Sequence, residues 1–135
     1  KRSLAYTVAL VPVLRAAAGM FVGYIATTPD REAEARAGLY EQFAQLVDAP
    51  LSAEEVERSR RYTIGTWQIR GQTNAAQLGD LLQAHLLGTG MDEIENFEAH
   101  IRAVDAQAIQ EVAQRYFKPE VAVEGVVRGT ARPAS

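Results

Sequence analysis

The sequence predicts an α+β fold: a two-layer sandwich in which a mainly antiparallel sheet is covered by helices. Three observations lead to this prediction. Residues 4–28 read as two apolar strands, residues 29–118 read as four or five amphipathic helices, and residues 121–128 read as a last, valine-rich strand. A strand that follows a helical run must return to the opening strand pair, because alone it could not bury its valines. The sheet is expected to hold further strands that this chain lacks.

The opening strand pair is apolar on both faces. Tyr6, Val8 and Leu10 alternate with smaller, largely apolar residues. A strand with two apolar faces is covered on both sides and lies inside a sheet. Pro12 cannot donate a ladder hydrogen bond and marks a strand end or an edge position. Two glycines predict a bend or a close backbone approach; they are Gly19, just before the second strand at residues 20–27, and Gly23, inside it.

A transmembrane helix is the alternative interpretation of residues 4–28, because the length and apolarity of the stretch come near the requirement. Three features oppose it. Arg15 would lie near the middle of the bilayer, Pro12 would break the helical ladder, and the residue types favour strands. We therefore expect a sheet and no membrane insertion.

Composition limits the function classes. The chain has 135 residues, 47% of them hydrophobic and 23% charged, which suits one domain with one core. The net charge of −3 gives no electrostatic footprint for nucleic acid. The absence of cysteine excludes disulfides, a thiolate nucleophile and a cysteine-based metal site. The chain begins without methionine and almost directly in a strand, so we expect a fragment of a longer protein.

The first two predicted helices have clear start signals. Thr28, Pro29 and Asp30 supply a capping hydroxyl, a proline at the first helical position and an acid near the positive dipole end. This helix ends ahead of Pro50. Ser52 and Glu55 form a capping box that opens the next helix. Gly65 inside that helix predicts a kink or a tight crossing.

The later predicted helices also have start and stop signals in the sequence. A break at residues 70–74 precedes a leucine-rich helix that ends at residues 88–90. A fourth helix covers residues 94–104, and Asp105 caps a fifth that ends at Lys118 and Pro119. The predicted domain therefore spans residues 1–129, and residues 130–135 read as a frayed tail.

The chain lacks a complete catalytic or metal-binding set. Its two histidines, His85 and His100, lie 15 residues apart on different predicted helices and outside any zinc-peptidase spacing. We expect His85 to be a buried or half-buried packing residue among leucines and His100 to lie at the surface. The glycines form no phosphate-binding motif, and the serines have no nucleophile-elbow context.

Two clusters of charge read as solvated helix faces. Such faces are common, and their exposed ion pairs are individually weak. The first cluster is Asp92, Glu93 and Glu95, and the second is Glu54, Glu55 and Glu57 with Arg58, Arg60 and Arg61.

Several short motifs, in the same order and spacing, resemble the insulinase/pitrilysin family of zinc peptidases. They are Arg-Ser-Leu-Ala-Tyr at residues 2–6, Tyr-Ile-Ala-Thr-Thr-Pro at 24–29, the helix start at 51–59, the last helix at 104–117 and the closing strand at 123–129. In that family two homologous α/β halves close around an extended peptide. Only one half carries the zinc-binding His-x-x-Glu-His, which this sequence lacks, so the resemblance implies the half without zinc.

The resemblance also implies one auxiliary site residue. The half without zinc supplies an arginine and a tyrosine, seven positions apart, that contact the substrate backbone. Tyr6 matches the tyrosine by its Leu-Ala-Tyr context, whereas the arginine would lie just before Lys1, and Arg2 does not match. Tyr6 would donate a hydrogen bond to a carbonyl oxygen or a developing oxyanion. The other interpretation of Tyr6 is an ordinary half-buried strand aromatic.

Two hypotheses follow from the resemblance. In the first, the chain is a non-catalytic, substrate-positioning half of a zinc endopeptidase, inactive alone, with zinc in a homologous partner half and an extended peptide as substrate. In the second, it is a scaffold homologue of the same fold that acts as an assembly subunit. An arginine seven residues before Tyr6 in the parent chain would favour the first. A third option is an unrelated α+β interaction module.

Overall fold

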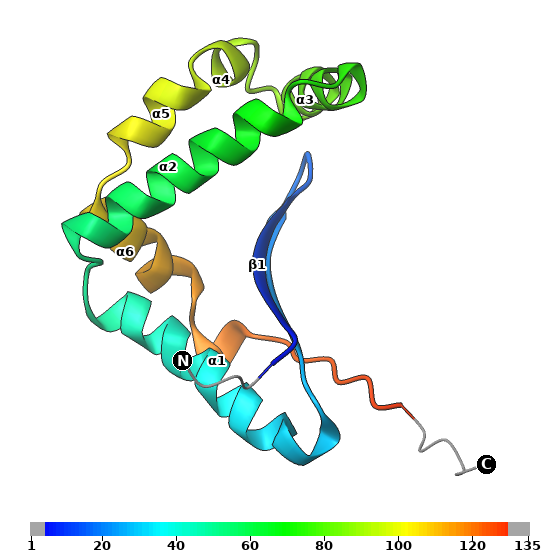
Figure 1. Ribbon diagram of the computed structural model, residues 1–135, viewed down its shortest axis with the longest axis vertical. Helices are drawn as coiled ribbons and strands as arrows, with labels where there is room; N and C mark the ends of the chain where they lie inside the picture. The colour runs from blue at the N-terminus through cyan, green and yellow to red at the C-terminus, as the bar shows by residue number, and fades with distance from the viewer. Residues whose placement is uncertain (1–4, 130–135) are drawn as a thin grey trace.

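The computed structural model describes residues 5–129, which form a strand pair followed by a curved layer of helices (Figure 1). The elements, in order, are β1 (Thr7–Leu14), β2 (Gly19–Ala26), η1 (Pro29–Arg31), α1 (Glu32–Asp48), α2 (Ala53–Arg70), α3 (Asn74–Leu87), α4 (Asp92–Glu95), α5 (Phe97–Ala103), α6 (Ala106–Tyr116) and η2 (Pro119–Val121). The helices lie on one side of the hairpin, so the predicted α+β class is confirmed (Figure 1).

The apolar stretch at the N-terminus is an antiparallel hairpin. Its register runs from Thr7 opposite Ala26 to Leu14 opposite Gly19. The predicted strand pair is confirmed, and the transmembrane-helix interpretation of this stretch is wrong. No helix in the part of the chain that the structure describes is long and apolar enough to cross a membrane.

Pro12 and Gly23 take the positions that their chemistry requires. Pro12 lies inside β1, which is an edge strand of the described two-stranded sheet, as predicted. Gly23 lies where the sheet meets α1, because an added Cβ there would be 3.1 Å from Cζ of Phe43. The predicted close backbone approach is therefore found at Gly23, and a larger residue would push the hairpin from the helix layer.

Local capping signals correctly predicted most helix boundaries. In α2, Ser52 and Glu55 form both halves of the capping box. Asp105 caps α6 by accepting a hydrogen bond of 2.8 Å from the backbone N–H of Ala108. Gly88 ends α3 with a positive φ of 71°, a conformation that glycine adopts without steric cost.

The helix layer contains a thin core. Among the described residues, five hydrophobic side chains are buried, and none of the larger side chains is fully buried. The buried residues are Ala35, Val56, Ile64, Ala84 and Ala113. The contacts between layers are therefore made largely by half-buried side chains, and much of the apolar surface of the hairpin is exposed.

The predicted last strand is wrong. Residue 121 belongs to η2, and residues 122–129 pair with no strand of the described chain. Val123 and Val127 are 97% and 100% exposed. The alternation that predicted a strand is real, but a strand needs a neighbouring backbone to satisfy its N–H and C=O groups. In this segment the alternate charged side chains bind to α1 instead.

Four other expectations also differ from the structure. Gly65 marks no tight crossing, since an added Cβ would meet nothing within 4 Å. The fourth helix is divided into α4 and α5 at Asn96. Thr28 precedes η1 without a side-chain capping hydrogen bond. Within residues 5–129 the hairpin is not covered on both faces. The predicted tail, residues 130–135, lies outside the described residues.

The two glycines give a paired stability prediction. We expect Gly23→Val to destabilise the protein by about 1–3 kcal/mol, because the new side chain must displace the ring of Phe43. Gly65→Ala should instead stabilise it by about 1 kcal/mol, since the position is helical and open. Urea unfolding measures both changes. A stabilising Gly23→Val would contradict the close approach of β2 to α1.

Candidate functional site

Tyr6, the site residue predicted from the resemblance, lies at the open end of the hairpin, immediately before β1. Its side chain is 82% exposed. Among the residues that the structure describes, its hydroxyl has no hydrogen-bond partner. The interpretation of Tyr6 as a half-buried strand aromatic is therefore wrong in this chain, and the phenol is available to an external group. Arg2 lies outside the described residues.

A β-bulge holds the backbone of Tyr6, because both Tyr6 and Thr7 lie opposite Ala26. The register places Thr7 opposite Ala26, and the N–H of Tyr6 also donates to the carbonyl of Ala26 at 2.8 Å. Two residues opposing one is the arrangement of a β-bulge, a feature that redirects a side chain at a strand end. The backbone of Tyr6 is thus held by the sheet while its side chain is exposed.

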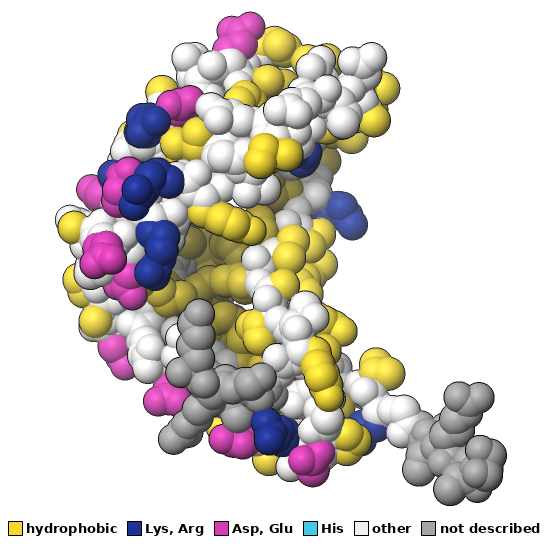
Figure 2. Space-filling model, viewed as in Figure 1, with side chains coloured by type: hydrophobic (Ala, Val, Ile, Leu, Met, Phe, Trp, Pro, Cys, Tyr) yellow, Lys and Arg dark blue, Asp and Glu magenta, His cyan; other side chains and the backbone are white. Residues whose placement is uncertain are grey.

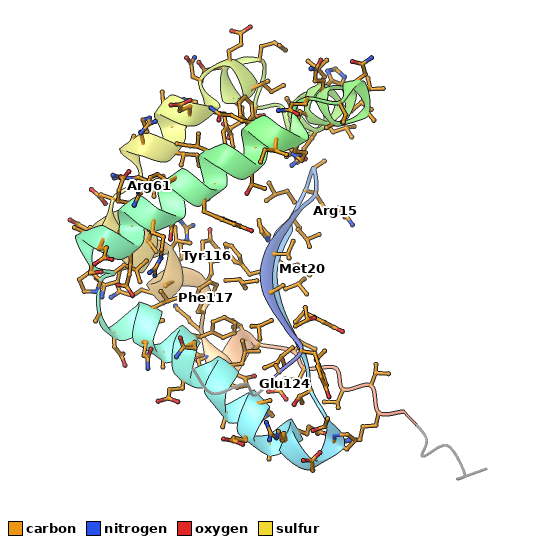
Figure 3. All side chains as sticks on the ribbon, viewed as in Figure 1. Arg15, Met20, Arg61, Tyr116, Phe117 and Glu124 are labelled. Atoms are coloured by element: carbon orange, nitrogen blue, oxygen red, sulfur yellow. The ribbon has the colours of Figure 1, made fainter. Side chains whose placement is uncertain are left out.

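The inner face of the hairpin is held by an aromatic cluster. The ring of Phe21 packs against Tyr116 at 5.9 Å and against Phe117 at 5.2 Å, and Phe117 packs against Phe43 at 5.1 Å between centroids. Figure 3 shows Tyr116 and Phe117 reaching from the end of α6 towards the hairpin. Each such pair contributes about 0.5–1.5 kcal/mol beyond area burial. The cluster joins β2, α1 and the end of α6.

A hollow lies between the hairpin and the helix layer. Figure 2 shows hydrophobic side chains gathered in it, with charged side chains mainly on the outer surface of the helices. The hydrophobic side chains of the hairpin are exposed on both sides; among them are Val8, Leu10, Val11, Met20 and Tyr24. An uncharged, concave wall suits the backbone and apolar side chains of an extended chain better than a charged ligand.

A polar latch fixes residues 122–128 to α1. The carboxylate of Glu124 accepts two-pronged hydrogen bonds from Arg36, at 2.7 and 2.8 Å, and a further bond from the hydroxyl of Tyr40. Arg128 binds Glu32 in the same way, at 2.6 and 2.7 Å. Arg36, Tyr40 and Glu124 also line an open depression of about 550 Å³. Because their polar groups already bind one another, we interpret this group as a latch.

The latch shifts the ionisation of its members. Hydrogen bonds from Arg36, then from Tyr40, lower the pKa of Glu124. The hydrogen bond from Arg128 lowers the pKa of Glu32 in the same way. Donating to Glu124 raises the pKa of Tyr40, so its phenol stays protonated. Near neutral pH the two carboxylates are therefore ionised and the phenol of Tyr40 is protonated, so the hydrogen bonds of the latch are all formed.

The two histidines form no site. His85 lies on α3 and is exposed, so the expected packing role is wrong. His100 lies on the surface of α5, as expected, and faces two carboxylates of α4: Asp92 at 3.4 Å and Glu93 at 3.8 Å. Within residues 5–129 no group of three or more histidine, aspartate or glutamate side chains could hold a metal ion. This part of the chain thus offers no ligand set for zinc.

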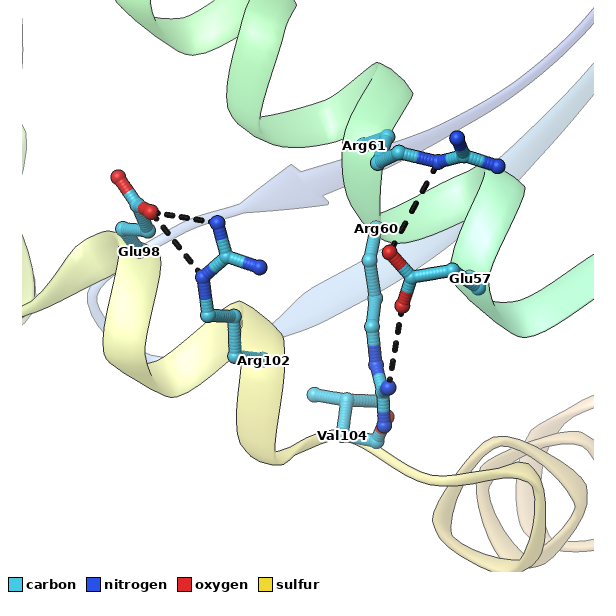
Figure 4. Close-up of polar contacts among 6 residues, drawn as sticks. All are labelled: Glu57, Arg60, Arg61, Glu98, Arg102 and Val104. Carbon is cyan, nitrogen blue, oxygen red and sulfur yellow. Dashed lines mark hydrogen bonds and ion pairs between the residues drawn. The ribbon is translucent and has the colours of Figure 1, made fainter. Parts of the chain in front are cut away.

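The charged clusters are solvated faces, as predicted, with one exception. Arg61 and Glu57 form a loose ion pair, 3.7 Å between their nearest atoms (Figure 4). Outside the two predicted clusters, Glu98 and Arg102 form a similar exposed pair at 2.7 Å. Arg60 differs, since its guanidinium also donates to the carbonyl of Val104 at 2.7 and 3.0 Å. It therefore joins α2 to the connection between α5 and α6.

Comparisons with known proteins find a likeness of fold. No family model and no curated protein matches the sequence. Among solved structures, the chain is similar to the inactive peptidase domain of a protein assigned as a zinc protease from Bordetella parapertussis. The TM-score is 0.73 and the identity 21%, over 98% of this chain and 71% of the other. At this identity the likeness is one of fold, and it agrees with the resemblance described above.

Sequence reasoning missed the latch and the aromatic cluster. The latch joins residues 88 and 96 positions apart in the chain, and no local pattern predicts such pairs. One usable signal existed, because the alternation of Glu124 and Arg128 with valines placed both charges on one side of an extended segment.

Acid should release the latch. Folding lowers the pKa of Glu124 and of Glu32. Their ion pairs therefore stabilise the folded segment fully above the ordinary pKa of 4.5, and this stabilisation is lost as the pH falls through the lowered values. We expect the backbone amides of residues 122–128 to become more mobile, as seen in NMR relaxation, when a sample at pH 7 is brought to an acidic pH well below 4.5. Glu124→Gln should produce this change at pH 7, whereas Glu111→Gln, which alters a carboxylate distant from the latch, should not. A segment equally ordered at both pH values would contradict the latch.

Proposed function

We propose that this chain is a non-catalytic, substrate-positioning half of a zinc-dependent endopeptidase of the insulinase type. The likeness of its fold to an inactive peptidase domain carries the proposal. In this proposal a homologous partner half holds the zinc, and the two halves enclose an extended peptide. Two observations support it: the described residues offer no zinc ligand set, and Tyr6 presents an exposed phenol at the end of an apolar wall.

The role proposed for this chain is to hold the peptide. The apolar hollow between the hairpin and the helices would accept alternate side chains of an extended substrate. Tyr6 would donate its hydroxyl proton in a hydrogen bond to a substrate carbonyl oxygen. That bond strengthens as negative charge develops on the oxygen in the transition state, so it favours the reaction more than it favours binding.

Substitution of Tyr6 tests this role in the whole protein that contains the chain. We expect Tyr6→Phe to lower kcat for a peptide substrate by about 10-fold or more, with a change in KM of about 3-fold or less, because the lost bond acts mainly in the transition state. Tyr24→Phe is the matched control, since it removes a phenol hydroxyl from the same hairpin and should leave kcat unchanged. Wild-type kcat in Tyr6→Phe would rule out the role.

Metal analysis tests which half carries the zinc. After exposure to zinc and removal of free metal, the chain should retain far less than one zinc per molecule, as measured by inductively coupled plasma mass spectrometry. The reason is the absence of a three-ligand group in residues 5–129. Retention of one zinc per chain, lost in His100→Ala, would overturn the assignment of this chain to the half without metal.

A further inference from the structure

Polar side chains on one helical face bridge the break between α4 and α5. Asp92, Asn96 and His100 follow one another at intervals of four residues, so they share that face. The backbone N–H of Asn96 donates to the carbonyl of Asp92, and the N–H of His100 donates to the carbonyl of Asn96, both at 2.9 Å. The side-chain amide of Asn96 also donates to Oδ1 of Asp92 at 2.7 Å. The face is therefore continuous, although the helix is divided at Asn96.

Both ring nitrogens of His100 face a carboxylate. Nε2 lies 3.4 Å from Oδ2 of Asp92, and Nδ1 lies 3.8 Å from Oε2 of Glu93. An ionised carboxylate only accepts hydrogen bonds, whereas a neutral imidazole has a proton on one nitrogen and a lone pair on the other. A neutral His100 therefore directs a lone pair at one of two negative groups. Only the protonated ring, with an N–H on each nitrogen and a positive charge, is complementary to both carboxylates.

The other charged groups of the neighbouring helices have partners of their own. Beside His100 on α5, Glu98 and Arg102 pair with each other at 2.7 Å. On α2, the second helix that packs against α5, Arg60 lies 3.5 Å from Glu57. Among residues 5–129, the ion pairs of His100 are therefore those with the two carboxylates of α4.

These polar contacts hold a weakly packed part of the helix layer. The helix α4 is a single turn of four residues, and none of them is buried. The helix α5 is anchored better, because the ring of Phe97 at its start is stacked on Trp67 of α2, with 4.8 Å between the ring centroids. The order of α4 relative to α5 therefore depends largely on the polar contacts between them.

We propose that Asp92, Glu93, Asn96 and His100 form a pH-sensitive joint, in which protonation of His100 pins α4 to α5 and loss of the proton loosens it. Histidine is the side chain that changes its charge between about pH 5 and 8. The joint is therefore tight in mildly acidic solution and looser above neutral pH. Figure 1 shows α5 on the side of α2 away from the hairpin, so the joint lies apart from the peptide site proposed above and does not depend on it.

Hydrogen exchange of the whole protein, measured by mass spectrometry, tests the joint. Samples would be labelled at about pH 8 and about pH 5.5, for times scaled to the intrinsic exchange rate of the backbone amides at each pH. Both conditions lie above 4.5, so the latch of Glu124 is formed in both. We expect peptides that cover residues 92–100 to be about 3-fold more protected at the lower pH, which is the size of effect that exposed ion pairs have.

Two histidine variants assign the effect to one side chain. His100→Gln keeps a polar side chain that cannot gain a proton, so residues 92–100 should be equally protected at both pH values. His85→Gln is the matched control on α3 and should keep the wild-type difference. Equal protection of the wild-type protein at both pH values, or a difference that persists in His100→Gln, would overturn the proposal. Loss of the difference in His85→Gln would overturn it as well, because the effect would then belong to the other histidine.

Discussion

The contact of Phe117 with Phe21 and Phe43 holds the two layers of this fold together. Phe117 follows the end of α6, Phe21 lies in β2 and Phe43 lies in α1. The ring centroid of Phe117 is 5.2 Å from that of Phe21 and 5.1 Å from that of Phe43. Gly23 allows β2 to approach α1 closely enough for these rings to meet. Because no large side chain among the described residues is fully buried, the position of the hairpin, and with it that of Tyr6, depends on contacts between half-exposed rings such as these.

The thin core has a physical consequence for function. A layer of helices that buries five small or medium side chains leaves its apolar hairpin exposed to water, which is unfavourable for an isolated molecule. The same exposure is useful where another polypeptide covers one side of the sheet and a substrate occupies the hollow on the other. The latch of Glu124 and Arg128 adds to this arrangement, because it holds an extended, valine-rich segment in place without a strand beside it.

Local sequence signals predicted where the helices and the hairpin lie. Contacts with distant residues decided whether residues 121–128 form a strand and which apolar faces are covered. The hairpin, the capping box of Ser52 and Glu55, and the cap at Asp105 depend on neighbouring residues and were predicted correctly. Residues 121–128 have the alternation of a strand, but strand formation needs a partner that the described chain does not provide. His85 lies on a leucine-rich face that looks like a core, yet no residue of the described part of the chain covers that face. For Tyr6 the sequence suggested a role by resemblance, and the structure adds that its phenol is exposed.

The central claim is that Tyr6 faces the peptide in an enzyme whose metal is held elsewhere. Photo-crosslinking tests it most directly. Benzoylphenylalanine would be placed at position 6 of the whole protein, and at position 62 on α2 as the control, since Tyr62 is also exposed. Irradiation with a labelled peptide substrate should attach the peptide at position 6 and not at position 62. Absence of a product at position 6, or equal capture at both positions, would contradict the claim.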